Sequence, residues 1–156
     1  MYGAKYSRAS QGPREPLDHI IGANSEEFNY NDLVTYASGF LEVVDGTSDR
    51  IDGISKIKKT MDSDNQTVDQ YEVPFIPLSE NDAFEMDFDS DAALSNQGQF
   101  FQVSTDGTGA QVVTVASASA TVGQLVLVKL DPRGEGDLSR GLFRVALNRT
   151  AFEPEA

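Results

Sequence analysis

Apolar and polar residues alternate along much of this chain, in short runs that end at turn residues. In the clearest run, residues 83–89, the even positions from Phe84 to Phe88 are apolar and the odd positions from Glu85 onward are acidic. A period of two is typical of a β-strand that buries one face and exposes the other to water. We therefore expect residues 83–89 to form a strand with one face in the core.

Two pairs of apolar runs predict β-hairpins. Residues 32–36 and 40–44 flank an Ala-Ser-Gly sequence, and residues 100–103 and 111–115 flank Asp106-Gly107. Glycine, serine and aspartate are common in tight turns because they adopt or support backbone conformations that other residues avoid. Each pair should therefore fold back on itself.

Two further runs predict strands at sheet edges. Residues 54–59 carry three lysines, and lysine guards an exposed edge against pairing with other chains. Residues 71–78 contain Pro74 and Pro77, which donate no backbone hydrogen bond. We expect the second run to lie at an edge, or to be bulged or broken.

The remaining pattern adds strands at 125–130 and 142–147 and a single helical turn at 92–95. The total is eight or nine strands with no helix of ordinary length. Parallel sheets need crossover connections of about a dozen residues or more, usually helical, so the pattern favours antiparallel over parallel βαβ architecture. The pattern predicts an all-β fold, a compact antiparallel β-barrel or sandwich-like domain.

The first 16 residues show no periodic apolar face and predict an extended N-terminal arm, which precedes a β-barrel-like domain at 17–150 and a C-terminal tail at 151–156. Fully extended, such an arm reaches roughly 50 Å. Two interpretations stay open: a frayed terminus, or a clamp on a neighbouring subunit. The clamp interpretation relies on the arm's aromatic and basic residues, which are Tyr2, Lys5, Tyr6, Arg8 and Arg14.

Composition narrows the possible functions. The chain has 25 acidic and 12 basic residues, a formal net charge of −13, which repels nucleic acid and anionic membranes. It has no cysteine, so disulfides and thiolate chemistry are excluded. Its start lacks the apolar run of a signal peptide, and no apolar stretch approaches the length of a membrane helix, so we expect a soluble intracellular product.

Candidate catalytic and metal-binding residues are few. The only histidine, His19, has no accompanying nucleophile motif. Asp87, Asp89 and Asp91 have the spacing that begins a calcium loop, but Ala92 occupies the position that needs glycine, and Gly98 the position that needs glutamate. We expect no metal, no cofactor and no enzymatic activity.

The order of these features resembles the capsid decoration proteins, also called cement or auxiliary head proteins, of tailed bacteriophages. The features are the Tyr- and Arg-bearing arm followed by Asn31-Asp32-Leu33-Val34, a Ser-Gly turn, Val73-Pro74-Phe75-Ile76-Pro77-Leu78, Asn96-Gln97-Gly98, Asp131-Pro132 and a last arginine-bearing strand. The resemblance covers most of the chain and lies in its layout.

The resemblance implies a structural protein, made in the host cytoplasm, that binds the major capsid protein on the outside of the virion and stabilises the shell. It also implies a homotrimer held by N-terminal arms, in which Tyr2, Lys5, Tyr6, Arg8 and Arg14 are the anchoring residues. Neither nucleic acid nor membrane is an expected partner. The alternatives are another β-rich virion component, such as a tail or head-fibre module, and a cytoplasmic ligand-binding β-barrel.

Overall fold

The computed structural model describes residues 4–8, 18–62, 72–79, 81–131 and 140–146, and for residues 5–8 it describes the backbone alone. These residues form thirteen strands and one short 3-10 helix at Leu94–Asn96. The strands in chain order are β1 (Lys5–Arg8), β2 (Asp18–Ile21), β3 (Glu27–Phe28), β4 (Leu33–Ala37), β5 (Phe40–Val43), β6 (Gly53–Ser55), β7 (Lys59–Thr60), β8 (Glu72–Pro77), β9 (Ala83–Asp87), β10 (Phe100–Thr105), β11 (Gln111–Ser119), β12 (Leu125–Leu130) and β13 (Arg140–Val145). The expected all-β class is confirmed.

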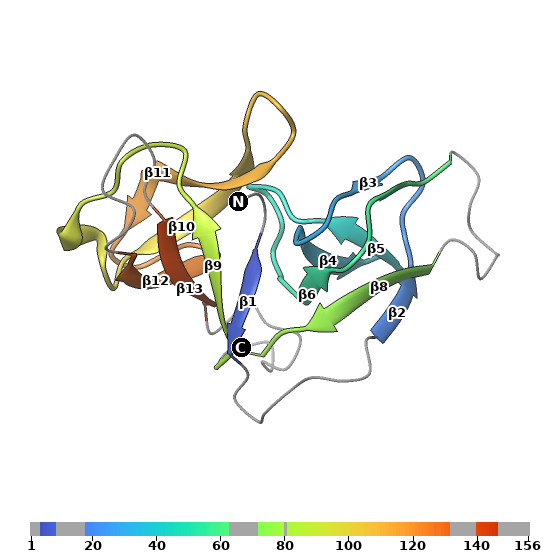
Figure 1. Cartoon of the computed structure of the whole chain (residues 1–156), viewed down its shortest axis with the longest axis horizontal. Coiled ribbons are helices and arrows are strands. Elements are labelled where there is room, and N and C mark those ends of the chain that lie inside the picture. Colours follow the sequence, from blue (N-terminus) through green and yellow to red (C-terminus); the bar gives the residue numbers. More distant parts are fainter. Residues whose placement is uncertain (1–3, 9–17, 63–71, 80, 132–139, 147–156) are drawn as a thin grey trace.

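Two antiparallel sheets form two lobes that lie side by side (Figure 1). One is six-stranded, in the order β1-β9-β13-β12-β10-β11, and the other is five-stranded, in the order β2-β8-β6-β4-β5. The short pair β3-β7 belongs to the five-stranded lobe, where Phe28 joins its core. The chain therefore begins with β1 in the six-stranded lobe, forms β2 to β8 of the other lobe, and then returns to the six-stranded lobe with β9 to β13.

Each sheet curls toward closure without forming a continuous barrel. In the five-stranded sheet a parallel bridge joins Gly22, just after β2, to Leu41 of β5. In the six-stranded sheet a similar bridge joins Phe88, just after β9, to Val113 of β11. The result is an open, sandwich-like arrangement, which is the second of the two expected architectures.

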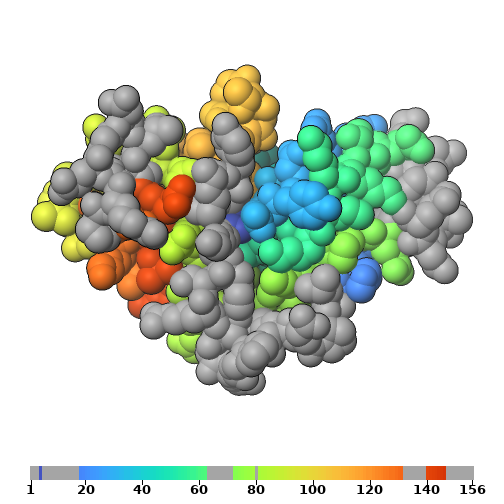
Figure 2. Space-filling model, in the orientation of Figure 1, coloured from blue at the N-terminus to red at the C-terminus, as the bar shows by residue number. Residues whose placement is uncertain are grey.

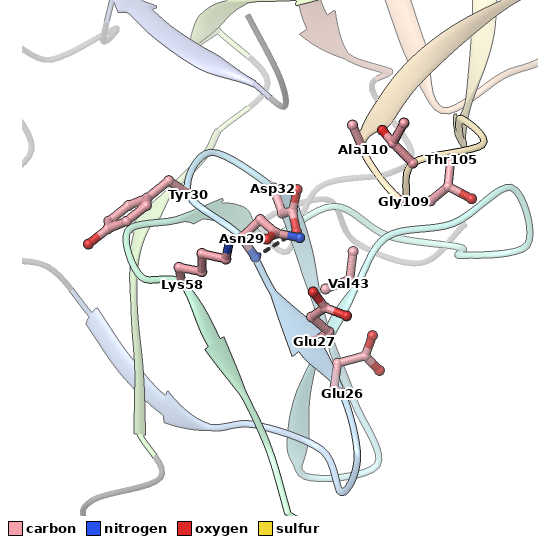
Figure 3. A pocket seen from close by; sticks show the side chains of 11 residues that line it. Glu26, Glu27, Asn29, Tyr30, Asp32, Val43, Lys58, Thr105, Gly109 and Ala110 are labelled. Carbon is pink, nitrogen blue, oxygen red and sulfur yellow. Dashed lines mark hydrogen bonds between the residues drawn. The ribbon is translucent and has the colours of Figure 1, made fainter.

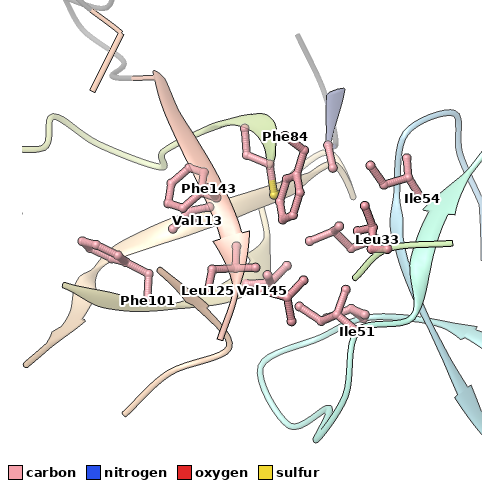
Figure 4. Packing of buried hydrophobic residues seen from close by; sticks show 14 of the residues in the cluster. Leu33, Ile51, Ile54, Phe84, Phe101, Val113, Leu125, Phe143 and Val145 are labelled. Atoms are coloured by element: carbon pink, nitrogen blue, oxygen red, sulfur yellow. The ribbon is translucent and has the colours of Figure 1, made fainter. Parts of the chain in front are cut away.

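Two hydrophobic clusters stabilise the lobes, and the larger one spans their junction (Figure 4). β4 contributes to both, because successive side chains of a strand point to opposite faces. Leu33 packs into the larger cluster and Val34 into the smaller one. β4 is thus buried on both faces, and the two lobes share one core.

Both predicted hairpins are confirmed. β4 pairs with β5, and the turn between them uses the left-handed backbone conformation at Ser38 and Gly39, with φ of 51° and 91°. Glycine accepts that conformation without strain because it has no Cβ. β10 pairs with β11 around Asp106-Gly107, again as the pattern predicts. Residues 83–89 follow their expected period as well, with Phe84, Met86 and Phe88 fully buried.

The two expected edge strands are both interior. β8 pairs with β2 on one side and β6 on the other, despite its prolines, and β6 pairs with β8 and β4. The lysine-bearing run is split: β6 ends at Ser55, and Lys59 belongs to β7. Residues 18–28 contain β2 and β3, which the apolar pattern does not predict.

Pro74 fits inside β8 because its nitrogen faces a place where no ladder bond is required. The carbonyl of Pro74 accepts from the N–H of Lys56 on the β6 side, just beyond Ser55–Phe75, where pairing with β6 ends. The early end of β6 therefore removes, at Pro74, the penalty that proline normally imposes on an interior strand.

Candidate functional site

The expected anchoring residues lie partly in β1, the outermost strand of the six-stranded sheet. Lys5 pairs with Glu85, Tyr6 with Phe84, and Arg8 with Ala83, all on β9. Tyr2 and Arg14 lie outside the described residues. The structure thus places Lys5, Tyr6 and Arg8 together on one strand, and their role as anchors stays a prediction.

Ala4, just before β1, fixes this strand at the junction of the lobes. It is fully buried in the larger cluster, and its N–H donates to the carbonyl of Asn31 in the other lobe. Residues 4–8 therefore lie against the rest of their own chain, a placement that the sequence pattern does not predict. A polar terminal sequence gives little sign of this, because a single alanine and a backbone ladder supply the contacts.

Two buried glutamines of the six-stranded lobe join it to backbone groups of the other lobe. The Gln111 side chain accepts from the N–H of Leu33 at 2.6 Å and donates to the carbonyls of Leu33 and Val44 at 3.0 and 2.8 Å. The Gln124 amide donates to the carbonyls of Asp45 and Ser48 at 2.6 and 2.9 Å. These bonds hold the lobes in one orientation.

An open pocket of about 520 Å³ lies where the tip of the β10–β11 hairpin approaches the β3–β4 segment. Figure 2 shows this tip, in gold, standing above the junction of the two lobes. Figure 3 shows Thr105, Gly109 and Ala110 on one side of the pocket. The acidic residues Glu26, Glu27 and Asp32 of the other lobe lie on the opposite side. The remaining lining residues are Asn29, Tyr30, Val43, Lys58 and Thr108.

Burial raises the pKa of two of the pocket's carboxyl groups, Asp32 and Glu26. Asp32 is 4% exposed and accepts from the N–H of Asn29 at 2.9 Å, yet burial outweighs this bond and raises its pKa to about 6. Burial also raises the pKa of Glu26, helped by the nearby charges of Glu42 and Asp45. The pocket therefore favours neutral or cationic groups over anions.

Matching Asp-Gly-Thr turns occur near the pocket, one in each lobe. In both, the aspartate accepts from the backbone N–H and the hydroxyl of the threonine, at 2.8 and 2.7 Å for Asp45 and 2.8 and 2.6 Å for Asp106. These bonds stabilise the charged form, which lowers the pKa of each aspartate. The two turns hold the loops that border the lobe junction.

Replacing Asp32 by asparagine should make the protein more stable near neutral pH, by about 1–2 kcal/mol after allowance for screening at the open pocket. Because the folded pKa is near 6 and the unfolded value is 3.8, the stability that Asp32 contributes is complete below pH 3.8 and is lost as the pH rises through 6. Urea unfolding of both proteins from pH 4 to 7 tests this. A difference that does not grow over that range would contradict it.

The carboxylates with calcium-like spacing have structural partners. Asp87 forms an ion pair with Arg140 at 2.8 Å, and Asp89 accepts from the N–H of Val115 at 2.9 Å. Across the described ranges there is no group of three or more histidine, cysteine or acidic residues positioned to hold a metal ion. These acids therefore join strands of the six-stranded lobe.

Two features considered in the sequence remain, which are the single histidine and the possibility of a membrane-spanning helix. His19 is exposed on β2, opposite Pro74. Within the part of the chain that the structure describes, no helix has the length and apolar character to cross a bilayer.

Sequence reasoning missed the pocket and both glutamines. Gln111 and Gln124 each stand at the start of an apolar run, where a polar residue is ordinary, and their partners lie 67 to 79 positions away. The turn at residues 29–32 has a local signal in the sequence. No neighbouring residue predicts that this turn faces the β10–β11 hairpin. Comparison with known proteins adds no further guide: no family model, curated protein or solved structure matches the chain.

Proposed function

We propose that this chain is a structural protein that binds the outer surface of a bacteriophage capsid and stabilises it, as a trimer anchored by N-terminal segments. The observation that carries the proposal is the position of β1: the start of the chain is a strand added to the edge of a sheet whose other strands all come after residue 82. A terminal strand of this kind is suited to bridging subunits, since strand addition supplies backbone hydrogen bonds.

The charge distribution supports the same proposal. Beyond its first 16 residues the chain carries 24 acidic and 9 basic residues, so the body of the protein is strongly acidic. Many copies of such a body on one particle repel each other, which limits clumping. The N-terminal segment carries Lys5, Arg8 and Arg14 against Glu15 alone, so it can approach an acidic neighbour.

A ligand-binding module is the less favoured candidate. Small-molecule pockets are mostly apolar, with a few polar groups that orient the ligand. Here Val43 and Ala110 are the aliphatic members of a lining that is otherwise polar, charged or glycine, apart from Tyr30, which is 60% exposed. The lining is therefore less like that of a ligand site than like a junction between the lobes.

Replacing Tyr2 and Tyr6 together by alanine should weaken binding to undecorated capsids by roughly 10- to 100-fold, because buried aromatic anchors dominate interfaces. Replacing Lys5 and Arg8 together should have a smaller effect, which disappears at high salt as the charges are screened. Co-sedimentation with capsids at low and high salt measures both.

The matched control is Tyr36→Ala, which removes a half-exposed tyrosine of β4 and should leave capsid binding unchanged. Thermal unfolding of each variant separates loss of binding from loss of folding. Full-strength binding by the folded Tyr2 and Tyr6 variant would remove the N-terminal segment from the mechanism. Failure of the unmodified protein to sediment with capsids would refute the function itself.

A further inference from the structure

The six-stranded sheet is assembled from two distant parts of the chain. Five of its strands, β9 to β13, come from residues 83–145, whereas β1 comes from residues 5–8. The whole five-stranded lobe lies between them in sequence. β1 is also an end strand, so its ladder has a single described partner, β9. β1 can therefore leave its sheet without breaking any strand pair other than its own pair with β9.

The acceptor site for β1 is well defined. It consists of the edge of β9, which pairs with Lys5, Tyr6 and Arg8 and includes an irregular step between Tyr6 and Arg8, together with the buried space that Ala4 fills. The carbonyl of Asn31, in the other lobe, accepts a hydrogen bond from the N–H of Ala4 and so helps to fix the position of β1 along β9. An identical copy of the chain presents the same edge, the same space and the same carbonyl.

The connection after β1 is long enough to reach another copy. Nine residues separate Arg8 from Asp18, and nine extended residues span about 30 Å. The connection contains Pro13 and Pro16, each of which disfavours helical conformation in the residue before it. Exchange of an identical element between copies is a low-cost route to assembly, and a connection of this length permits it.

From this placement we propose that β1 is exchanged between copies of this chain: each copy pairs its β1 with β9 of the next copy and places its Ala4 in the next copy's core. Repeated head to tail, the exchange closes a ring of three. The inference rests on the proposed function, from which it takes the trimeric state. It adds that the acceptor of each N-terminal segment is a second copy of this chain.

Cysteine cross-linking tests the exchange directly, because the native chain contains no cysteine. Residues directly opposite each other in an antiparallel pair are close enough for a disulfide. The double variant Lys5→Cys with Glu85→Cys should therefore oxidise to a covalent trimer, seen on a non-reducing gel. An intrachain disulfide in a monomeric product would overturn the exchange.

One control and one complementary experiment accompany this cross-linking. The pair Gln102→Cys with Thr114→Cys lies within the β10–β11 hairpin and should give an intrachain disulfide, which shows that oxidation leaves the monomer intact. In a second arm, chains with Lys5→Cys alone are unfolded and refolded with chains carrying Glu85→Cys alone. A disulfide between residues 5 and 85 in a covalent dimer, identified by mass spectrometry, supports exchange, and its absence opposes exchange.

Capsid binding distinguishes this inference from the function on which it rests. If the oxidised double variant is a monomer that still sediments with capsids, the exchange is wrong and the proposed function stands. If it is a covalent trimer that does not sediment with capsids, the exchange stands and the proposed function is wrong.

Discussion

Replacing Gln111 by alanine should lower the free energy of unfolding by about 3–5 kcal/mol. Gln111 is 1% exposed, and its side chain satisfies the N–H and carbonyl of Leu33 and the carbonyl of Val44. Alanine would leave the N–H of Leu33 and the carbonyl of Val44 without this partner, whereas the carbonyl of Leu33 still accepts from the N–H of Val44. Each buried unsatisfied group costs roughly 1–3 kcal/mol. The loss should also loosen the lobe junction.

Urea unfolding monitored by circular dichroism measures this loss, and Gln102→Ala is the matched control. Gln102 lies on the neighbouring strand β10 with an exposed side chain, so its replacement should change stability by no more than about 0.5 kcal/mol. A loss below about 1 kcal/mol for Gln111→Ala would mean that water satisfies the exposed backbone groups, and the glutamine would then not hold the lobes together.

Replacing Phe88 by alanine should lower the free energy of unfolding by about 3–5 kcal/mol as well. Phe88 is fully buried, and its ring meets those of Phe101 and Phe143 edge to face, at centroid distances of 5.2 and 5.3 Å. Alanine removes the ring, leaves a cavity, and ends both aromatic contacts. Phe88 also forms the bridge to Val113, so the curl of the six-stranded sheet should weaken.

The conservative variant Phe88→Leu provides the control, because it keeps most of the apolar volume and should lose clearly less stability than alanine. Chemical unfolding of the three proteins gives the ranking, and hydrogen exchange at β9 and β11 reports the curl. Equal losses for leucine and alanine would show that ring geometry, and not filled volume, determines the stability of this cluster.

The parts of the fold that the sequence predicts correctly depend on neighbours in the chain. The period of two around Phe84 and the turn at Ser38-Gly39 are local signals, and both are confirmed. The errors concern pairing between distant strands. Pro74 indicates an edge only if its neighbours are long, and the shortness of β6 is not visible from β8.

The candidate site is harder to predict for the same reason. The sequence pattern predicts that Asp32 belongs to a strand. Its raised pKa results from burial at a junction, which forms only when the hairpin of residues 100–119 packs beside the β3–β4 segment. Likewise, a polar arm with tyrosines predicts an extended segment, which is correct for β1. Its pairing with β9, whose Phe84 is 78 positions from Tyr6, has no local signal.

That separation has a consequence for synthesis on the ribosome. The strands of the five-stranded lobe, from β2 to β8, are all synthesised before β9 exists, so they can begin to pair while translation continues; the core that they share with the other lobe forms later. β1 must wait for β9, about 80 residues later, and at 5–20 residues per second the delay is roughly 4–16 s. During those seconds β1 has no acceptor within its own chain. Nascent chains on the same messenger would therefore meet their neighbours with the first strand still unpaired.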